Sequence, residues 1–390
     1  MMDVRTRLSR RRFLTQAFQG TGLLIAAQFI PGAALGQDAA IVPGQAETTV
    51  PITDAQVQAG LSPYNWICTK DFISSSVCGA SLSVGFKGTK QVAILVDSAM
   101  AARKDPLRIP VIAWSVNGGA LQTYEFGLEE KSFVLTSGVQ DPVIDLYIKG
   151  MSPSERRWDT DLPVNSLKIL GFKVDDGAVT VPMPPLEKIW LNIGDSIMSG
   201  DGALQGEKAG RPKVWATTGD ARASYGYLLA QHYGHREARL AFGGYNWAGG
   251  MAKVPALTTL IDQHTEKASR LNDGCLKPAP AVALINLGAN GVQPQAEIVA
   301  ALKKVRSRIG KQCQLIVMVP TSGAAREVTT LALNNYKHSE KDDRAYLVDL
   351  GKFPFSTCDG LHPTTTGHRT IYETALPAFD AILKTKAAKQ

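Results

Sequence analysis

The chain has 390 residues, of which 44% are hydrophobic and 20% are charged, and its formal net charge is +7. This length is enough for about two domains with buried cores. Residues 1–36 contain five arginines and one aspartate, so the remainder carries only +3 and no basic block. That balance argues against binding to nucleic acid or to a membrane surface.

Residues 1–36 have the features of a twin-arginine export signal. Residues 9–14 (SRRRFL) match the twin-arginine pattern, a weakly apolar run follows over 21–30, and residues 34–36 (ALG) form a small-residue cleavage site. The apolar run is too short for a good membrane span, and no later stretch is long enough for one. We therefore expect the twin-arginine translocase to export the folded protein, with cleavage near Gly36, so that it is periplasmic or secreted.

Residues 37–61 are predicted to be a loose N-terminal lead, and residues 62–185 to form an all-β domain. Short apolar runs separated by turn signals are typical of a sandwich or jelly roll. The predicted strands are 80–86, 91–96, 109–116, 132–136, 143–148 and 167–174. The domain ends in a stiff, proline-rich linker over 181–185 (VPMPP).

From residue 186 to residue 390, strands alternate with helices. The predicted strands are 189–193, 238–242, 281–287, 314–319 and 345–350, and the predicted helices are 224–232, about 255–270, 295–309, 326–337 and 364–384. Such alternation predicts a parallel sheet with helices on both faces, a three-layer α/β/α domain. Ligands of such sheets bind at the carboxyl ends of the strands.

Five cysteines remain after the signal: Cys68, Cys78, Cys275, Cys313 and Cys358. An oxidising periplasm permits disulfides. Cys275 and Cys313 each come just before a predicted strand, so neighbouring parallel strands would bring them together as a disulfide. A Cys68–Cys78 bridge is a second candidate, which would leave Cys358 free. No spacing resembles a zinc site, and no metal is expected.

Two short motifs carry the chemistry. Residues 194–196 (GDS) follow the strand 189–193, and residues 359–363 (DGLHP) lie near the other end of the chain. A serine at a strand-to-helix turn exposes its hydroxyl above a parallel sheet. Ser196 is therefore the predicted nucleophile, His362 its base and Asp359 the carboxylate that orients the base. Asp195 is expected to cap or brace the turn rather than to react.

Four blocks in this order resemble the SGNH (GDSL-type) hydrolases. They are residues 194–196, the glycine pair 243–244 after the second strand, residues 288–290 (GAN) and residues 359–363. The resemblance implies an oxyanion hole made by the backbone N–H groups of Ser196 and Gly244 and the side-chain amide of Asn290. The sequence departs from the family in two places. Gly291 stands where the family commonly has aspartate, and the second block lacks the usual polar residue before its glycine.

Residues 167–177, the prolines 184–185 and the strand into the GDS block resemble carbohydrate esterase family 2. Those enzymes join an N-terminal jelly roll to an SGNH domain and remove acetyl groups from polysaccharides. The resemblance implies an exported serine esterase that removes O-acetyl groups from a carbohydrate polymer through an acyl-serine, without a cofactor. Acetylated cellulose, hemicellulose and peptidoglycan are candidate substrates.

Two other functions fit parts of this pattern. A lipase, a thioesterase or an O-acetyltransferase uses the same triad. A non-catalytic polysaccharide-binding or synthase-associated protein would have a dead site, and the intact Ser196, His362, Asp359 and Asn290 argue against it.

The sequence assigns the roles of several aromatic and histidine side chains less clearly. Tyr245, Trp247 and Trp215 could line a sugar platform or belong to the core. His232 and His235 are expected on the surface, and His368 is expected to be structural.

Overall fold

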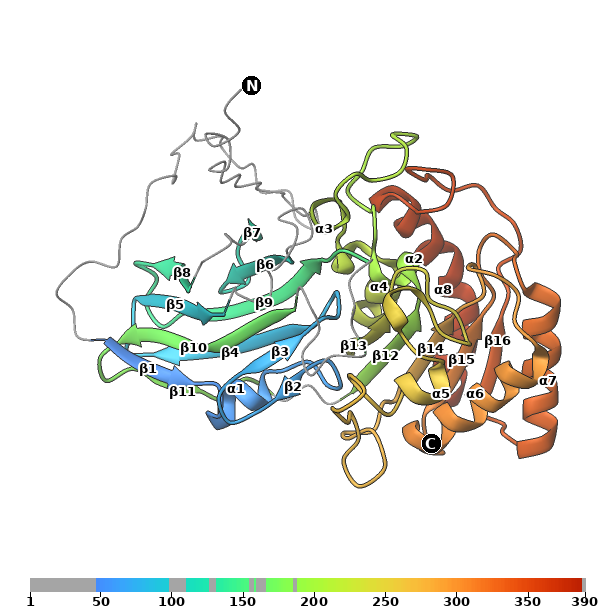
Figure 1. Ribbon diagram of the computed structural model, residues 1–390, viewed down its shortest axis with the longest axis horizontal. Helices are drawn as coiled ribbons and strands as arrows, with labels where there is room; N and C mark the ends of the chain where they lie inside the picture. The colour runs from blue at the N-terminus through green and yellow to red at the C-terminus, as the bar shows by residue number, and fades with distance from the viewer. Residues whose placement is uncertain are drawn as a thin grey trace.

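The computed structural model describes residues 47–97, 110–125, 131–153, 158, 166–184 and 188–387. An all-β sandwich lies beside an α/β domain (Figure 1). This arrangement confirms the predicted fold class. The export signal predicted over residues 1–36 lies outside the described residues.

The sandwich consists of two antiparallel sheets. One has the order β2-β3-β10-β5-β8, with β1 also paired to β10, and the other has the order β11-β4-β9-β6-β7. Along β4 the side chains of Leu82, Val84 and Phe86 are buried while the alternate serines are partly exposed, as expected for a strand with one face on a core. The ring of Phe86 meets that of Phe172 in the other sheet edge to face, with centroids 5.6 Å apart.

The strands of the sandwich are β1 (Glu47–Pro51), β2 (Ile67–Cys68), β3 (Ile73–Ser75), β4 (Ser81–Lys87), β5 (Gln91–Val96), β6 (Val111–Val116), β7 (Gln122–Glu125), β8 (Ser132–Ser137), β9 (Val143–Gly150), β10 (Leu167–Asp175) and β11 (Val179–Val181). The short helix α1 (Ala55–Ala59) lies between β1 and β2 in the chain.

Residues 47–61 are not a loose lead. Strand β1 pairs with β10 from Glu47 opposite Asp175 to Pro51 opposite Gly171. Helix α1 follows, and Val57 on it is fully buried. The segment is too short and too polar for its own periodicity to predict a strand, and its structure depends on pairing with a strand more than a hundred residues away.

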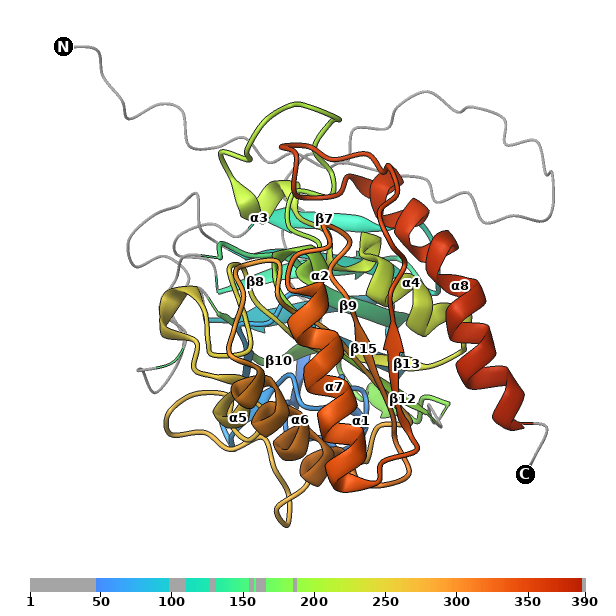
Figure 2. The ribbon, with the colours of Figure 1, turned by 90° about the vertical axis from the view of Figure 1, so that its right-hand side faces the viewer.

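In the α/β domain, five parallel strands have the order β13-β12-β14-β15-β16. Alternate side chains of the sheet face opposite layers. Leu191 joins the apolar cluster of α5, α6 and α7, whereas Trp190 joins that of α4 and α8. Figure 2 shows these two groups of helices on opposite sides of the strands. Burial on both faces explains why β12 is buried along its whole length.

The strands of this domain are β12 (Ile189–Gly194), β13 (Arg236–Ala241), β14 (Val282–Asn286), β15 (Gln314–Met318) and β16 (Ala345–Val348). The helices are α2 (Ser196–Ser199), α3 (Trp215–Thr218), α4 (Tyr225–His232), α5 (Leu257–Leu260), α6 (Gln295–Ile309), α7 (Arg326–Glu340) and α8 (Thr365–Ala387).

The helix predicted over about 255–270 is mostly wrong, because only α5 forms there. The Thr265 hydroxyl accepts hydrogen bonds from the backbone of residues 267 and 268, and the Asp262 carboxylate holds Arg308 at 2.8 Å. Side chains that bond locally to the backbone compete with helical hydrogen bonds. The segment therefore continues as a hydrogen-bonded loop.

The predicted disulfides do not form in this structure, where no disulfide joins Cys68, Cys78, Cys275 or Cys313. Strands β14 and β15 are neighbours as expected. However, Cys275 lies seven residues before β14 and directs its sulfur to the Ser307 carbonyl at 3.9 Å. Cys313 is buried just before β15.

Strand β9 connects the sandwich to the α/β domain. The Tyr147 hydroxyl donates to the Asp220 carboxylate at 3.1 Å, and the buried Lys149 ammonium donates to the Gly219 carbonyl at 3.2 Å. Arg222 and Asp145 add a two-pronged ion pair with distances of 2.6 and 3.1 Å. A continuous apolar cluster also runs through both domains. The sandwich therefore fixes the segment that begins at α3, and this segment adjoins the site described next.

Candidate active site

The nucleophile turn is built by close packing at the end of β12. A Cβ on Gly194 would lie 2.4 Å from the Cβ of Met198, so only glycine fits there. Asp195 is the N-cap of α2, and its carboxylate accepts a hydrogen bond from the Ile197 N–H at 2.9 Å. This is the capping role expected from the sequence. Ser196 is thereby held at the first position of α2, with 7% of its surface exposed.

The structure brings the three residues of the predicted triad together. The Nε2 atom of His362 lies 3.0 Å from the Ser196 hydroxyl, and its Nδ1 atom lies 2.8 Å from the Asp359 carboxylate. Burial alone would raise the pKa of Asp359, but hydrogen bonds from the backbone and the imidazole of His362 hold it below its usual value. Asp359 is therefore a carboxylate at neutral pH and can orient the imidazole and stabilise its cation.

The predicted oxyanion donors lie on loops that follow neighbouring strands. Gly244 follows β13 with a φ of +66°, and a Cβ there would lie 2.6 Å from Met251. Asn290 follows β14, and its amide donates to the Asp195 carboxylate and to the Tyr245 carbonyl, both at 3.1 Å. The glycine loop and the asparagine loop therefore contact each other beside the nucleophile turn. An oxyanion there would compete with these two acceptors for the amide protons.

We expect Asn290→Ala to lower kcat by about 10²- to 10³-fold with little change in KM. The reason is that an oxyanion donor acts mainly in the transition state. Steady-state kinetics on an acetyl ester measure both constants. An unchanged kcat would place the oxyanion hole elsewhere.

Asp195 is expected to make stability depend on pH. Burial raises its pKa to about 6, despite the hydrogen bond from the Ile197 N–H. The folded protein then holds a proton that the unfolded chain has released, so stability is lost as pH rises from about 4 to about 6. Relative to Asp195→Asn, which does not titrate, the wild type should lose about 3 kcal/mol over this range. Urea unfolding at several pH values measures the difference, and a constant difference would contradict the prediction.

The structure also separates the aromatic candidates. Tyr245 and Trp247 are buried with 0% and 2% of their surfaces exposed, so they belong to the core. Trp215 is half-buried, and its ring lies edge to face with His362 at a centroid distance of 5.0 Å. Of the three, Trp215 is the one whose ring contacts a residue of the predicted triad.

The remaining candidate histidines differ in exposure. His235, expected on the surface, is half-buried, because its ring packs edge to face with the buried Trp190 at a centroid distance of 5.8 Å. His232 is exposed and meets the Tyr372 hydroxyl at 3.0 Å. His368 is fully buried, and burial lowers its pKa to about 3, which fits a structural role. Among the described residues, no group of three or more His, Cys, Asp or Glu side chains is arranged to hold a metal ion. In the same part of the chain, no helix is both long and apolar enough to cross a membrane.

The sequence analysis did not identify Arg239, whose side chain supports α2, the helix that begins at Ser196. The side chain is fully buried on β13 and donates to the Met198 carbonyl of α2 at 2.8 Å. It also donates to the Ala221 carbonyl and pairs with Glu237. Glu237 and Arg239 were the available signal, because two charged residues two positions apart on a strand share one face, and here that face is buried.

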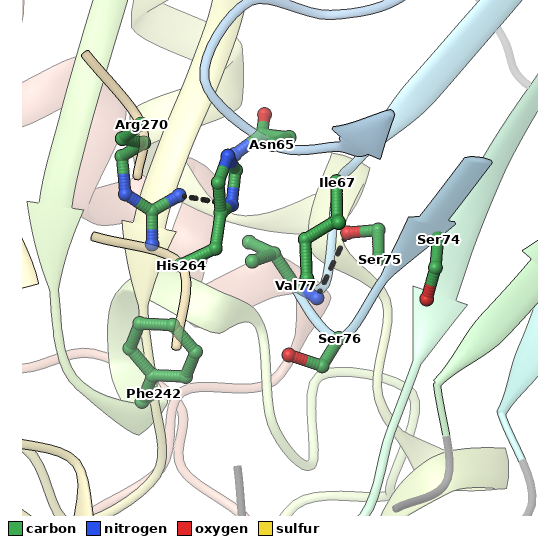
Figure 3. Close-up of a pocket in the computed structure, with 9 residues that line it drawn as sticks. All are labelled: Asn65, Ile67, Ser74, Ser75, Ser76, Val77, Phe242, His264 and Arg270. Carbon is green, nitrogen blue, oxygen red and sulfur yellow. Dashed lines mark hydrogen bonds between the residues drawn. The ribbon is translucent and has the colours of Figure 1, made fainter. Parts of the chain in front are cut away.

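A small pocket lies between the two domains, and no triad residue lines it (Figure 3). The sandwich contributes residues 65, 67 and 74–77, and the α/β domain contributes Phe242, His264 and Arg270. Arg270 donates to the Nδ1 atom of His264 at 2.9 Å. Burial lowers the pKa of His264 well below its usual value, so this imidazole is neutral. The pocket is part of the domain interface.

A family model described as GDSL-like lipase/acylhydrolase matches residues 191–375, which contain all four blocks. No curated protein sequence matches the chain.

Solved structures of family two carbohydrate esterases share the fold. The enzyme from Cellvibrio japonicus has a TM-score of 0.70 at 15% identity, covering 87% of this chain and 99% of its own. The enzyme from Clostridium thermocellum in complex with cellohexaose has a TM-score of 0.64 at 17% identity, covering 83% and 98%. An acetyl xylan esterase from Butyrivibrio proteoclasticus has a TM-score of 0.67 at 15% identity, covering 87% and 99%. At these identities the likeness establishes the two-domain fold.

Proposed function

Because the chain carries a GDSL-type lipase/acylhydrolase domain in the two-domain fold of family 2 carbohydrate esterases, we propose that it is an exported serine esterase that removes O-acetyl groups from a carbohydrate polymer. The observation that carries the proposal is the continuous contact from Ser196 through His362 to Asp359, at 3.0 and 2.8 Å. A serine hydroxyl, an imidazole and a carboxylate in this order form the constellation of acyl transfer.

The first half of the reaction forms an acyl-enzyme. The Ser196 oxygen attacks the ester carbonyl carbon while its proton passes to the Nε2 atom of His362. The carbonyl oxygen becomes an oxyanion, which the Ser196 and Gly244 N–H groups and the Asn290 amide would stabilise. The intermediate collapses when the bond to the sugar oxygen breaks, and the imidazolium donates its proton to that oxygen. The polymer hydroxyl is thereby released.

The second half returns the enzyme to its starting state. A water molecule transfers a proton to His362 as its oxygen attacks the acyl carbon of the acetyl-serine. The second oxyanion collapses, the bond to the Ser196 oxygen breaks, and the imidazolium returns the proton to that oxygen. Acetic acid leaves, and no cofactor takes part in the sequence of steps.

Three observations support a polymeric carbohydrate substrate and an exported enzyme. Structural neighbours include an acetyl xylan esterase and an esterase in complex with cellohexaose. The sandwich approaches the site, since Pro153 packs so tightly on Gly243 that a Cβ there would lie 2.2 Å from the proline Cβ. Residues 9–14 carry the twin-arginine pattern.

We predict that catalytic efficiency rises with substrate length. Binding energy from remote sugar units can be used at the reacting centre, so a small chromogenic acetate should be the poorer substrate. The measurement is kcat/KM for acetate release from that ester and from acetylated xylo- and gluco-oligosaccharides of increasing length. Export is tested separately, by replacing Arg10 and Arg11 with lysine and measuring the protein in the periplasm.

The acetate-release assay also distinguishes the alternative functions, because each predicts a different result. A preference for long acyl chains would favour a lipase, and transfer of acetyl to an added sugar acceptor instead of water would favour an O-acetyltransferase. Binding to polysaccharide without acetate release from any ester would overturn the enzymatic proposal.

A further inference from the structure

A basic loop borders the catalytic histidine. The loop comprises residues 205–214 and carries three exposed cations, Lys208, Arg211 and Lys213, against one acid, Glu207. The Lys208–Glu207 pair is 3.8 Å apart and its side chains are 88% and 57% exposed, so it neutralises little. Among the described residues, Arg211 and Lys213 form no ion pair.

The loop is fixed to the segment that supplies the triad. The N–H of Lys208 donates to the Thr357 carbonyl at 3.0 Å, and the N–H of Gly210 donates to the Cys358 carbonyl at 2.7 Å. Pro212 is buried, and a Cβ on Gly202 would lie 3.4 Å from it. The backbone of the basic loop is therefore hydrogen-bonded to the two residues that precede Asp359, which keeps the three cations near the triad.

One of the cations is linked to the catalytic base by two ring contacts. The guanidinium carbon of Arg211 lies 5.7 Å from the centroid of the Trp215 ring. That indole lies 5.0 Å from the imidazole of His362. The positive charge is thus within about one Debye length, ~10 Å at 0.1 M salt, of the imidazole. A charge at this distance can interact with a group next to the ester that His362 would serve.

We propose that the basic loop is a subsite for carboxylate groups, and that the substrate is an O-acetylated acidic polysaccharide whose neighbouring units carry carboxylates. The half-buried Trp215 would stack on a sugar ring beside the ester, and Arg211 and Lys213 would bind the carboxylate of the next unit. Arginine offers the planar pair of donors that matches a carboxylate. This inference rests on the proposed esterase function and adds the charge of its substrate.

The test compares one substrate in two charge states. Acetylated oligogalacturonate is assayed for acetate release as the free acid and after methyl esterification of its carboxylates. We expect the free acid to have a roughly 10-fold higher kcat/KM at low salt, with most of the advantage lost at about 0.5 M NaCl. The double variant Arg211→Gln, Lys213→Gln should bring the ratio of acid to methyl ester to about 1, whereas Arg211→Lys should retain part of it.

Lys311→Gln is the matched control, because this exposed lysine precedes the amino end of β15, whereas the site lies beyond the carboxyl ends of the strands, and the change should leave the ratio unchanged. Equal efficiency of wild type on both charge states would overturn the acidic-substrate inference while leaving the esterase proposal intact. A ratio that survives the double variant would overturn the assignment to this loop. Absence of acetate release from every carbohydrate, neutral or acidic, would instead overturn the proposed function.

Discussion

Replacement of Ser196 by alanine is expected to lower kcat for acetyl ester hydrolysis by a factor on the order of 10⁶. The acyl-enzyme cannot form without the hydroxyl, and the His362 imidazole, 3.0 Å away, then has no nucleophile to deprotonate. Some catalysis over water should persist, because the backbone donors and the substrate-binding surface remain.

The same variant should stay folded, since the change deletes one atom from a side chain whose oxygen is bonded to the base and not to the core. Circular dichroism and the urea midpoint are the controls. A serine-reactive phosphonate should label wild-type Ser196 and fail to label the variant. Labelling of another residue in the wild type, or full activity in the variant, would show that the nucleophile lies elsewhere.

The second large effect concerns the base and its partner. His362→Ala is expected to cost on the order of 10⁶ in kcat, and Asp359→Asn on the order of 10⁴. The loss in Asp359→Asn is smaller because the imidazole of His362 is still present. An asparagine still fills the site but presents an amide proton to the Nδ1 atom, which favours the tautomer that cannot accept the serine proton. The triad is then weakened but not removed.

Single-turnover kinetics with an acetyl ester measure both losses, with Thr364→Ser as a nearby control outside the triad. Equal and total losses would mean that Asp359 also holds the loop. That outcome has a physical basis, because one carboxylate oxygen accepts hydrogen bonds from the backbone N–H groups of Leu361 at 3.1 Å and His362 at 2.8 Å. Thermal unfolding of Asp359→Asn would then show a loss of stability as well.

Contacts between the two domains help to hold a residue of the site in position. Strand β9 of the sandwich holds Asp220 and Gly219 through Tyr147 and Lys149, and α3 with Trp215 lies just before them. The ring beside His362 is therefore positioned partly by the sandwich. The two domains share an apolar cluster, so activity assays are best made on the whole chain.

The sequence by itself determined the alternation of strands and helices in the α/β domain and the candidate chemistry. Helix α6 was predicted over 295–309 and is found over Gln295–Ile309, because its apolar residues follow the helical period along one face. The alternation of strands and helices was enough to predict the parallel sheet, and the GDSL match supports the family resemblance. Short local motifs also identified Ser196, Asp359 and His362 as candidates, and their catalytic roles stay predictions.

Only the tertiary structure decided which distant residues meet. Strand β1 exists because β10 pairs with it, and Arg239 supports α2 through contacts that no local pattern records. It also decided that Tyr245 and Trp247 are core residues whereas Trp215 faces the site, and that Cys275 and Cys313 remain apart. Periodicity reports which face of an element is buried, but the partner on that face is set by packing between segments far apart in the chain.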